Sequence, residues 1–205
     1  MRRRARTALV VVTAAQRLVE LRLSARNRAS VGPAEQAAAS TYPVMVATHV
    51  ALFAVCAWPR RGRRVARPVE GAALVGLAAA TGLRVWAIRT LGTSWNVTAH
   101  VPKDGHIETG GPYRYVRHPN YVAVALEFLC LPIAVGAVPE AIALSAMNAA
   151  VLVPRIRSEE RLLDAISGYH EAFEGVPRFI PRRGRRSRHT PASDSQSRGV
   201  TSRNV

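Results

Sequence analysis

Long apolar stretches that alternate with arginine-rich stretches are the feature that most constrains how this chain can fold. The longest apolar stretch covers residues 121–153. An α-helix needs about 20 residues to cross the hydrocarbon core of a bilayer, so this stretch is too long for one span. Pro132, Gly136 and Pro139 interrupt it near the middle, and proline disfavours helix at its own position and in the residue before it. We therefore predict two membrane helices joined as a tight hairpin.

Three more apolar stretches precede the hairpin, and they cover residues 8–23, 42–58 and 71–88. The first follows a basic start, as the core of a signal peptide does, but Gln16, Arg17 and Glu20 interrupt it. We interpret it as a membrane helix that packs its polar side chains against partner helices, with a cleaved signal peptide as the alternative. The predicted fold class is all-α, with about five transmembrane helices.

The net charge of +16, from 29 Lys and Arg against 13 Asp and Glu, favours anionic partners such as lipid headgroups. The stretch 182–205 is rich in Arg and Ser and nearly devoid of large apolar residues, so we predict a disordered basic tail there. Residues 1–181 would then form one membrane-embedded domain. The hairpin places residues 92–118 and the tail on the same face, predicted to be cytoplasmic by the positive-inside rule, although the basic loop 60–67 on the opposite face argues against that orientation.

Several kinds of site are not indicated. Cys56 and Cys130 each lie inside an apolar run, where cysteine usually serves as a packing residue. The sequence has no cysteine and histidine cluster with metal-ligand spacing and no glycine-rich dinucleotide or Walker motif. We expect neither a bound metal nor a nucleic-acid partner.

Two polar stretches flank the hairpin and must meet in space. The first is "GPYRYVRHPNY", residues 111–121, and the second covers residues 154–173. Within the second, Arg155 and Glu159 are four residues apart and share one face of a helix. Groups gathered at headgroup depth could hold a polar ligand from water and an apolar ligand from lipid. The plainer interpretation is that the Tyr and Arg are interfacial anchors.

The segments "TGGPYRYVRHPNY", "RIRSEERLL" and "GYHEAF", with the apolar hairpin between the first two, resemble the isoprenylcysteine carboxyl methyltransferase family of integral membrane methyltransferases. The resemblance is best over residues 105–181 and is nearest to the small bacterial members. It implies that S-adenosylmethionine binds in a cytosol-facing pocket closed by the segment after the last helix. It also implies a catalytic part at residues 92–181 and a lipid substrate that arrives through a tunnel from the bilayer.

Carried over residue by residue, the resemblance implies roles for particular side chains. Arg155 falls where the family places an arginine that faces the reacting substrate group, and Glu159 would contact the cofactor, so these two are the catalytic candidates. The other predicted cofactor-binding residues are His106, Ile107, Tyr113, His118, Pro119, Asn120 and Tyr121. The chain departs from the family pattern at Ala123, where glycine is frequent, and at Glu127, which becomes a candidate substrate-binding residue. Prenylcysteine is therefore not carried over as the substrate.

The chemistry of these residue types agrees with the resemblance. Arg and His can bind the cofactor's carboxylate, Glu its ammonium or ribose hydroxyls, and tyrosine faces its cationic sulfur. A carboxylate acceptor needs no base. A phenol, with a pKa of about 10, must lose a proton, and Glu159, Glu160 and His118 are the candidate bases.

The predicted function is methyl transfer to a carboxylate or hydroxyl of an isoprenoid, fatty or polyketide-like substrate at the cell membrane. Two alternatives remain. One is a membrane NADPH-dependent reductase of the steroid reductase type, which carries a similar Arg-His-Pro-Asn-Tyr motif. The other is a non-enzymatic membrane protein whose basic tail binds lipid or nucleic acid.

Overall fold

The computed structural model describes residues 2–30, 35–36, 41–58, 65–98, 100–101 and 107–181. This part of the chain is almost entirely helical. Its long helices are α1 (Arg3–Ser30), α2 (Tyr42–Ala57), α3 (Arg67–Leu91), α4 (Pro119–Ala134) and α5 (Val138–Asp164). The shorter elements are the 3-10 helices η2 (Gly92–Ser94) and η3 (Gly111–Arg114), the helix α6 (Tyr169–Ala172), and the antiparallel strands β1 (Glu35–Gln36) and β2 (His100–Val101). The predicted tail 182–205 and most of the basic loop 60–67 lie outside the described residues.

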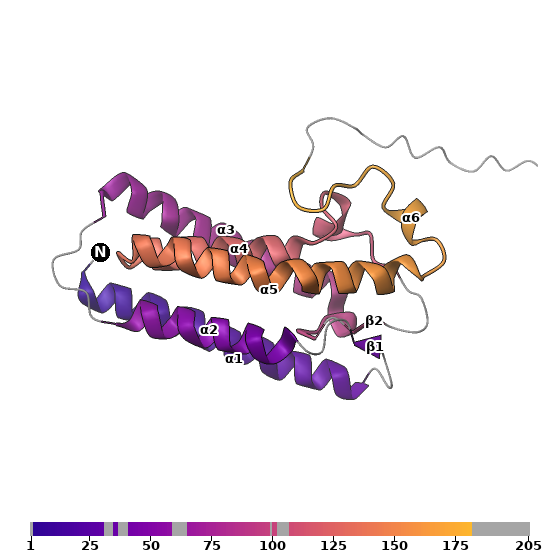
Figure 1. Cartoon of the computed structure of the whole chain (residues 1–205), viewed down its shortest axis with the longest axis horizontal. Coiled ribbons are helices and arrows are strands. Elements are labelled where there is room, and N and C mark those ends of the chain that lie inside the picture. The colour runs from indigo at the N-terminus through magenta and orange to yellow at the C-terminus, as the bar shows by residue number, and fades with distance from the viewer. Residues whose placement is uncertain are drawn as a thin grey trace, which may run out of the picture.

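The helices form an elongated bundle of two layers. Figure 1 shows α3, α4 and α5 side by side in one layer and α1 with α2 in the other. Helix α2 contacts both α4 and α5, and so joins the layers. The short elements gather at the end of the bundle where α4 begins (Figure 1). The polar motif and the end of α5 therefore lie at the same end of the molecule.

The predicted hairpin is present. Helix α4 ends at Ala134 and α5 begins at Val138, and Gly136 in the connecting turn has a φ of 90° that favours glycine. Pro132 does not end α4, as the sequence suggested, but lies inside its last turn, where its carbonyl accepts a hydrogen bond from the Ala137 amide at 2.7 Å. Helix α5 continues beyond the apolar run to Asp164.

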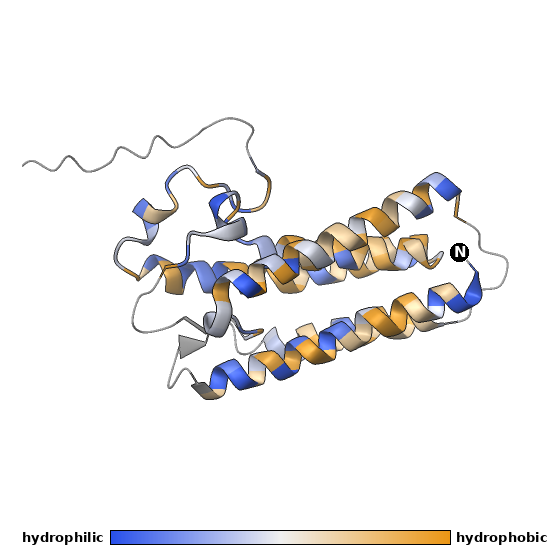
Figure 2. Ribbon diagram, turned by 180° about the vertical axis from the view of Figure 1, so that it is seen from behind, coloured by the Kyte–Doolittle hydropathy of each residue, from blue (hydrophilic) through white to orange (hydrophobic). Residues whose placement is uncertain are grey.

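Helix α1 is polar on its inner side and apolar on its outer side. Val12 and Val19 are 66% and 62% exposed, whereas Glu20, Ser24 and Asn27 are buried. A helix on the surface of a water-soluble protein has the reverse arrangement. Figure 2, which colours the ribbon by hydropathy, shows apolar segments along the middle of the bundle and polar segments toward its ends. Both observations suit a helix bundle whose outer face contacts lipid.

Among the described residues, one helical stretch, 67–94, is long and apolar enough to cross a bilayer. Helices α2 and α4 are apolar but have 16 residues each. The structure thus supports a membrane-embedded helical fold, while the number of spans remains a prediction.

The contact between α3 and α4 depends on Gly76. A Cβ atom at this position would lie 2.6 Å from the Cys130 sulfur, whereas one at Gly82 would meet nothing within 4 Å. We expect Gly76→Ala to destabilise the protein in detergent by about 1–3 kcal/mol through overpacking, and Gly82→Ala to be neutral or stabilising, since alanine favours helix. In a Cys130→Ala background the loss at Gly76 should disappear. Thermal unfolding of the variants measures this, and equal melting temperatures for the two glycine variants would contradict the packing.

The hairpin also predicts which residues share a side of the membrane. Single cysteines replace Tyr115, His170 or Val138 in a background lacking Cys56 and Cys130. A membrane-impermeant thiol reagent should label positions 115 and 170 from one side, expected to be cytoplasmic, and position 138 from the other, because α4 and α5 run antiparallel between them. Labelling of 115 and 138 from the same side of sealed vesicles would rule out a spanning hairpin.

Candidate functional site

The polar motif is fixed against the end of α3 by a glycine. Gly111 opens η3 with a φ of 52°, and a Cβ atom there would lie 2.2 Å from the Thr90 hydroxyl oxygen. Only glycine fits both the backbone conformation and the space. The chain then passes through His118 into α4, whose first residue is Pro119, a position that suits proline because its missing amide proton has no helical partner there.

The hydroxyl group of Tyr121 joins the two predicted catalytic residues. Arg155 donates a hydrogen bond from Nε to this hydroxyl at 3.1 Å, and the hydroxyl donates to Oε2 of Glu159. Arg155 is 2% exposed, and its Nη2 atom donates to the Val97 carbonyl at 2.5 Å. Its Nη1 atom is buried without a hydrogen-bond partner in the described part of the chain. The face shared by Arg155 and Glu159 therefore points at the start of α4.

Glu160, the neighbour of Glu159, holds a second part of the motif. It lies 3.1 Å from Nε2 of His118 and accepts a hydrogen bond from Nε of Arg178 at 2.7 Å. Burial raises the pKa of Glu160, but hydrogen bonds and charge from His118 and Arg178 outweigh it and hold the pKa below its ordinary value. Glu160 is thus a charged anchor between α5 and the motif, a role that the sequence did not reveal.

The segment after α6 crosses the motif. The Arg117 amide donates to the Pro177 carbonyl at 2.9 Å, and the His118 amide donates to the Arg178 carbonyl at 3.1 Å. The ring of Phe179 lies 5.9 Å from that of His118. The segment after the last helix therefore lies against the motif, and its closure of a cofactor pocket there stays a prediction.

Tyr113 belongs to a small apolar cluster at this end. It packs with Tyr169 and Phe173, and Ile107 lies against the same cluster. Burial raises the pKa of Tyr113 well above its ordinary value, and the charges of Glu159 and Glu108 act in the same direction. Burial also raises the pKa of Tyr169 to about 12. Both phenols therefore stay neutral near pH 7. Ile107 supports the cluster from outside the cavity described next, and His106 lies outside the described residues.

One cavity of about 330 Å³ connects these groups with the apolar part of the bundle. Its polar end contains most of the residues predicted from sequence, namely Tyr113, His118, Pro119, Asn120, Tyr121, Arg155 and Glu159. Its other wall is formed by apolar side chains of α1 and α2, including Leu18, Val46 and Phe53. The cavity is also lined by Trp95, Asn96 and Val97. These residues lie within the predicted catalytic part, but no motif in the sequence identified them as site residues.

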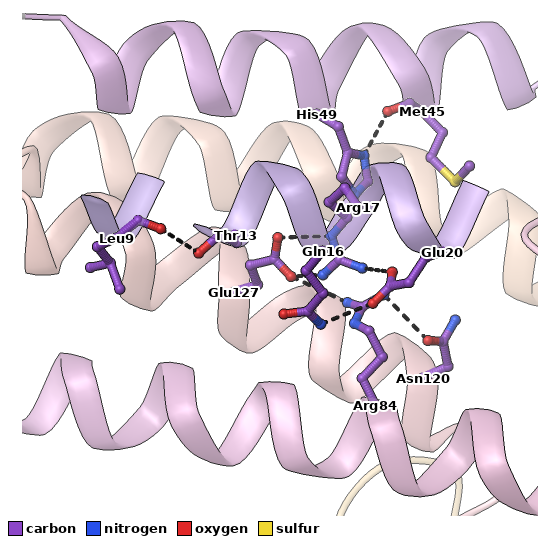
Figure 3. Close-up of polar contacts among 10 residues, drawn as sticks. All are labelled: Leu9, Thr13, Gln16, Arg17, Glu20, Met45, His49, Arg84, Asn120 and Glu127. Atoms are coloured by element: carbon purple, nitrogen blue, oxygen red, sulfur yellow. Dashed lines mark hydrogen bonds and ion pairs between the residues drawn. The ribbon is translucent and has the colours of Figure 1, made fainter. Parts of the chain in front are cut away.

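Glu127, the predicted substrate-binding residue, is paired with two arginines. It accepts a hydrogen bond from Nε of Arg17 at 3.0 Å and another from Nη2 of Arg84 at 3.4 Å (Figure 3). Arg17 and Arg84 line the cavity. The predicted contact between Glu127 and a substrate would therefore have to act through these arginines.

The comparisons with known proteins agree with this geometry. Residues 72–165 match the family described as the Isoprenylcysteine carboxyl methyltransferase (ICMT) family. The chain is also 29% identical over 163 residues to the protein named Uncharacterized protein YpbQ of Bacillus subtilis (strain 168), an alignment that covers 78% of this chain and 96% of that protein. The family match includes most of α3, the polar motif, α4, Arg155 and Glu159. Residues 72–165 of this chain are thus similar to the isoprenylcysteine carboxyl methyltransferase family, and this stretch carries the polar end of the cavity.

Proposed function

We propose that the protein is an S-adenosylmethionine-dependent O-methyltransferase that acts on a carboxylate or hydroxyl group of a lipophilic acceptor. The observation that carries this proposal is one continuous cavity, whose polar end is formed by the motif with Arg155 and Glu159 and whose other wall is mainly apolar. A reaction between a water-soluble cofactor and a lipid requires such a two-sided space. The family match over 72–165 favours methyl transfer over the reductase alternative.

The polar end suits the charges of S-adenosylmethionine. The Nε atom of Arg117 is buried without a hydrogen-bond partner among the described residues, and Arg117 lines the cavity. It can donate to the cofactor's carboxylate, as the motif residue His118 can. Glu159, also in the cavity wall, can accept from the ammonium group or a ribose hydroxyl, and the ring of Tyr113 offers an aromatic surface for a cationic sulfur.

Arg155 has the geometry expected of a residue that faces the acceptor. Tyr121 and the Val97 carbonyl hold two of its nitrogen atoms, so the guanidinium is fixed before any ligand arrives. Nη1 remains as a spare donor that can stabilise negative charge on the attacking oxygen. The bound cofactor would supply an electrophilic methyl group, which needs alignment and exclusion of water more than acid–base chemistry.

A hydroxyl acceptor would need to release its proton to a nearby group. Glu159 lines the cavity, whereas Glu160 is engaged by His118 and Arg178. Glu159 is therefore the favoured base among the three candidates, and its bond from Tyr121 offers a route for redistributing the proton. A carboxylate acceptor would use the same site without this step.

The apolar wall supports a lipophilic acceptor. Leu18 and Val50 line the cavity and are 58% and 63% exposed. In a membrane these surfaces contact lipid, so an acyl or isoprenoid chain can pass between α1 and α2 into the cavity. We accordingly place the protein in the cell membrane as a multi-pass protein, with the motif end of the bundle facing the cytoplasm.

The purified protein in detergent should bind S-adenosylmethionine. His118→Ala should weaken binding by about 1–3 kcal/mol, the usual loss for a buried hydrogen bond to a charged group. His170→Ala is the matched control, because His170 is exposed and lies 3.6 Å from Asp164, away from the cavity. Isothermal titration calorimetry measures both. Folded wild-type protein that binds no S-adenosylmethionine would overturn the proposed function.

The roles of Arg155 and Glu159 should separate experimentally. Glu159→Gln should raise the Kd for S-adenosylmethionine. Arg155→Ala should leave that Kd within about threefold and lower turnover at least tenfold, since a positioned cation contributes a few kcal/mol to a developing negative charge. Arg155→Lys should restore activity only in part, because lysine lacks the planar pair of donors.

The assay for these variants is transfer of a labelled methyl group into a lipid extract, with cofactor binding measured separately. If Arg155→Ala lost cofactor affinity and activity to the same degree, Arg155 would belong to the cofactor pocket instead.

A further inference from the structure

Four charged side chains form a closed cluster inside the helical bundle, and we call it the quartet. Arg17 and Glu20 come from α1, Arg84 from α3 and Glu127 from α4 (Figure 3). Arg17 pairs with both Glu20 and Glu127. Arg84 lies 3.4 Å from Glu127 and 3.6 Å from Glu20. Each of these side chains is at most 11% exposed.

The quartet is part of the cavity wall. Arg17, Glu20 and Arg84 all line the cavity, and Arg84 also donates to Oδ1 of Asn120 at 3.4 Å. Asn120 is the neighbour of Tyr121 in the motif, so the quartet adjoins the polar end. Glu127 follows Tyr121 by six residues, which corresponds to about 9 Å along the axis of α4. Glu127 thus lies deeper in the bundle than Tyr121, whereas Arg84 reaches from Glu127 back to the motif.

Stability alone is a weak reason for such a cluster. Removing charged groups from water costs several kcal/mol per ion, and well-packed apolar residues often serve equally well. Ionisable residues within a membrane bundle more often mark a path or a site for a ligand. Here the pairing is also incomplete, because Nε of Arg84 is buried without a hydrogen-bond partner in the described ranges. The contacts of Arg84 with Glu20, Asn120 and Glu127 are also long, at 3.4–3.6 Å.

We propose that the quartet is a second polar subsite for the methyl acceptor, and this inference rests on the proposed function. Arg84 donates to an oxygen atom of the acceptor that is distinct from the oxygen being methylated near Arg155. The acceptor is then an amphiphile with two separated oxygen functions, and its hydrocarbon part lies along the apolar wall of α1 and α2.

The charge of the subsite indicates that this second oxygen belongs to an uncharged group. Two arginines and two glutamates cancel, and at the other end of the cavity Arg155 is balanced by Glu159. A carboxylate or phosphate placed at the quartet would lack a counter-charge in a medium of low dielectric constant, which is costly. A hydroxyl or carbonyl group can accept from the spare donor of Arg84 without disturbing the ion pairs.

The wild-type protein provides the first test. Methyl groups from labelled S-adenosylmethionine are transferred into a lipid extract of the source organism, and the labelled products are analysed by mass spectrometry. The expected products carry at least one further uncharged oxygen group, a hydroxyl or a carbonyl, in addition to the new methyl ester or methyl ether. Products with no such oxygen would overturn the inference and leave the proposed function intact.

A paired substitution provides the second test. Arg84→Gln with Glu127→Gln removes one cation and one carboxylate, so Arg17 and Glu20 remain as a balanced pair. The extract concentration that gives half-maximal transfer should rise at least tenfold, while the Kd for S-adenosylmethionine stays within threefold. Arg161→Gln with Glu171→Gln, which neutralises one exposed charge of each sign, is the matched control and should change neither quantity.

The outcomes of the second test are distinct. A quartet that only holds α1 in place would lower the melting temperature of the double variant and leave the half-maximal concentration unchanged, which would overturn the inference. Failure of the wild-type protein to bind S-adenosylmethionine would instead contradict the proposed function. If the double variant does not fold, the oxygen content of the wild-type products still decides.

Discussion

The polar contacts of α1 with the other helices are the interaction on which the arrangement of the site depends. In lipid, apolar side chains gain nothing from turning inward, so helices associate through close packing and hydrogen bonds. Helix α1 follows this rule. Besides the ion pairs of Arg17 and Glu20, the Ser24 hydroxyl accepts from the Val97 amide at 3.0 Å, and Asn27 donates to the Trp95 carbonyl at 2.6 Å. These contacts fix residues 95–97, and the Val97 carbonyl in turn holds Arg155.

The two ends of the cavity are organised by different kinds of interaction. At the motif end, Tyr121 connects Arg155 with Glu159, while Glu160 connects His118 with the segment that crosses the motif. Glu159 and Glu160 are neighbours on α5 but bind different partners, because their side chains leave the helix in different directions. At the inner end, balanced charges replace this network, and the rest of the wall is apolar except for His49.

The family match and the cavity wall do not coincide. Residues 72–165 include the motif, Arg84, Glu127 and Arg155. The apolar wall and half of the quartet come from α1 and α2, which precede the matched residues. The family match therefore covers the motif end of the cavity better than the apolar end that would hold the proposed acceptor. This division is the physical reason why the acceptor cannot be inferred from the family alone.

Much of the fold and part of the site could be predicted from local patterns in the sequence. Apolar runs with central Pro and Gly predict the hairpin, and the spacing of Arg155 and Glu159 predicts their common face, because both depend on residues a few positions apart. Several contacts could not be predicted. Arg17 meets Glu127 across 110 positions, and Glu160 meets His118 across 42.

Neither of these partners follows from helical periodicity. By itself, the sequence determined where helices form and which residues each helix presents together. Only the tertiary structure decided which helix faces α1, and hence that its polar stripe completes the wall of the cavity, because helix pairing in a bundle is set by packing among segments far apart in the chain.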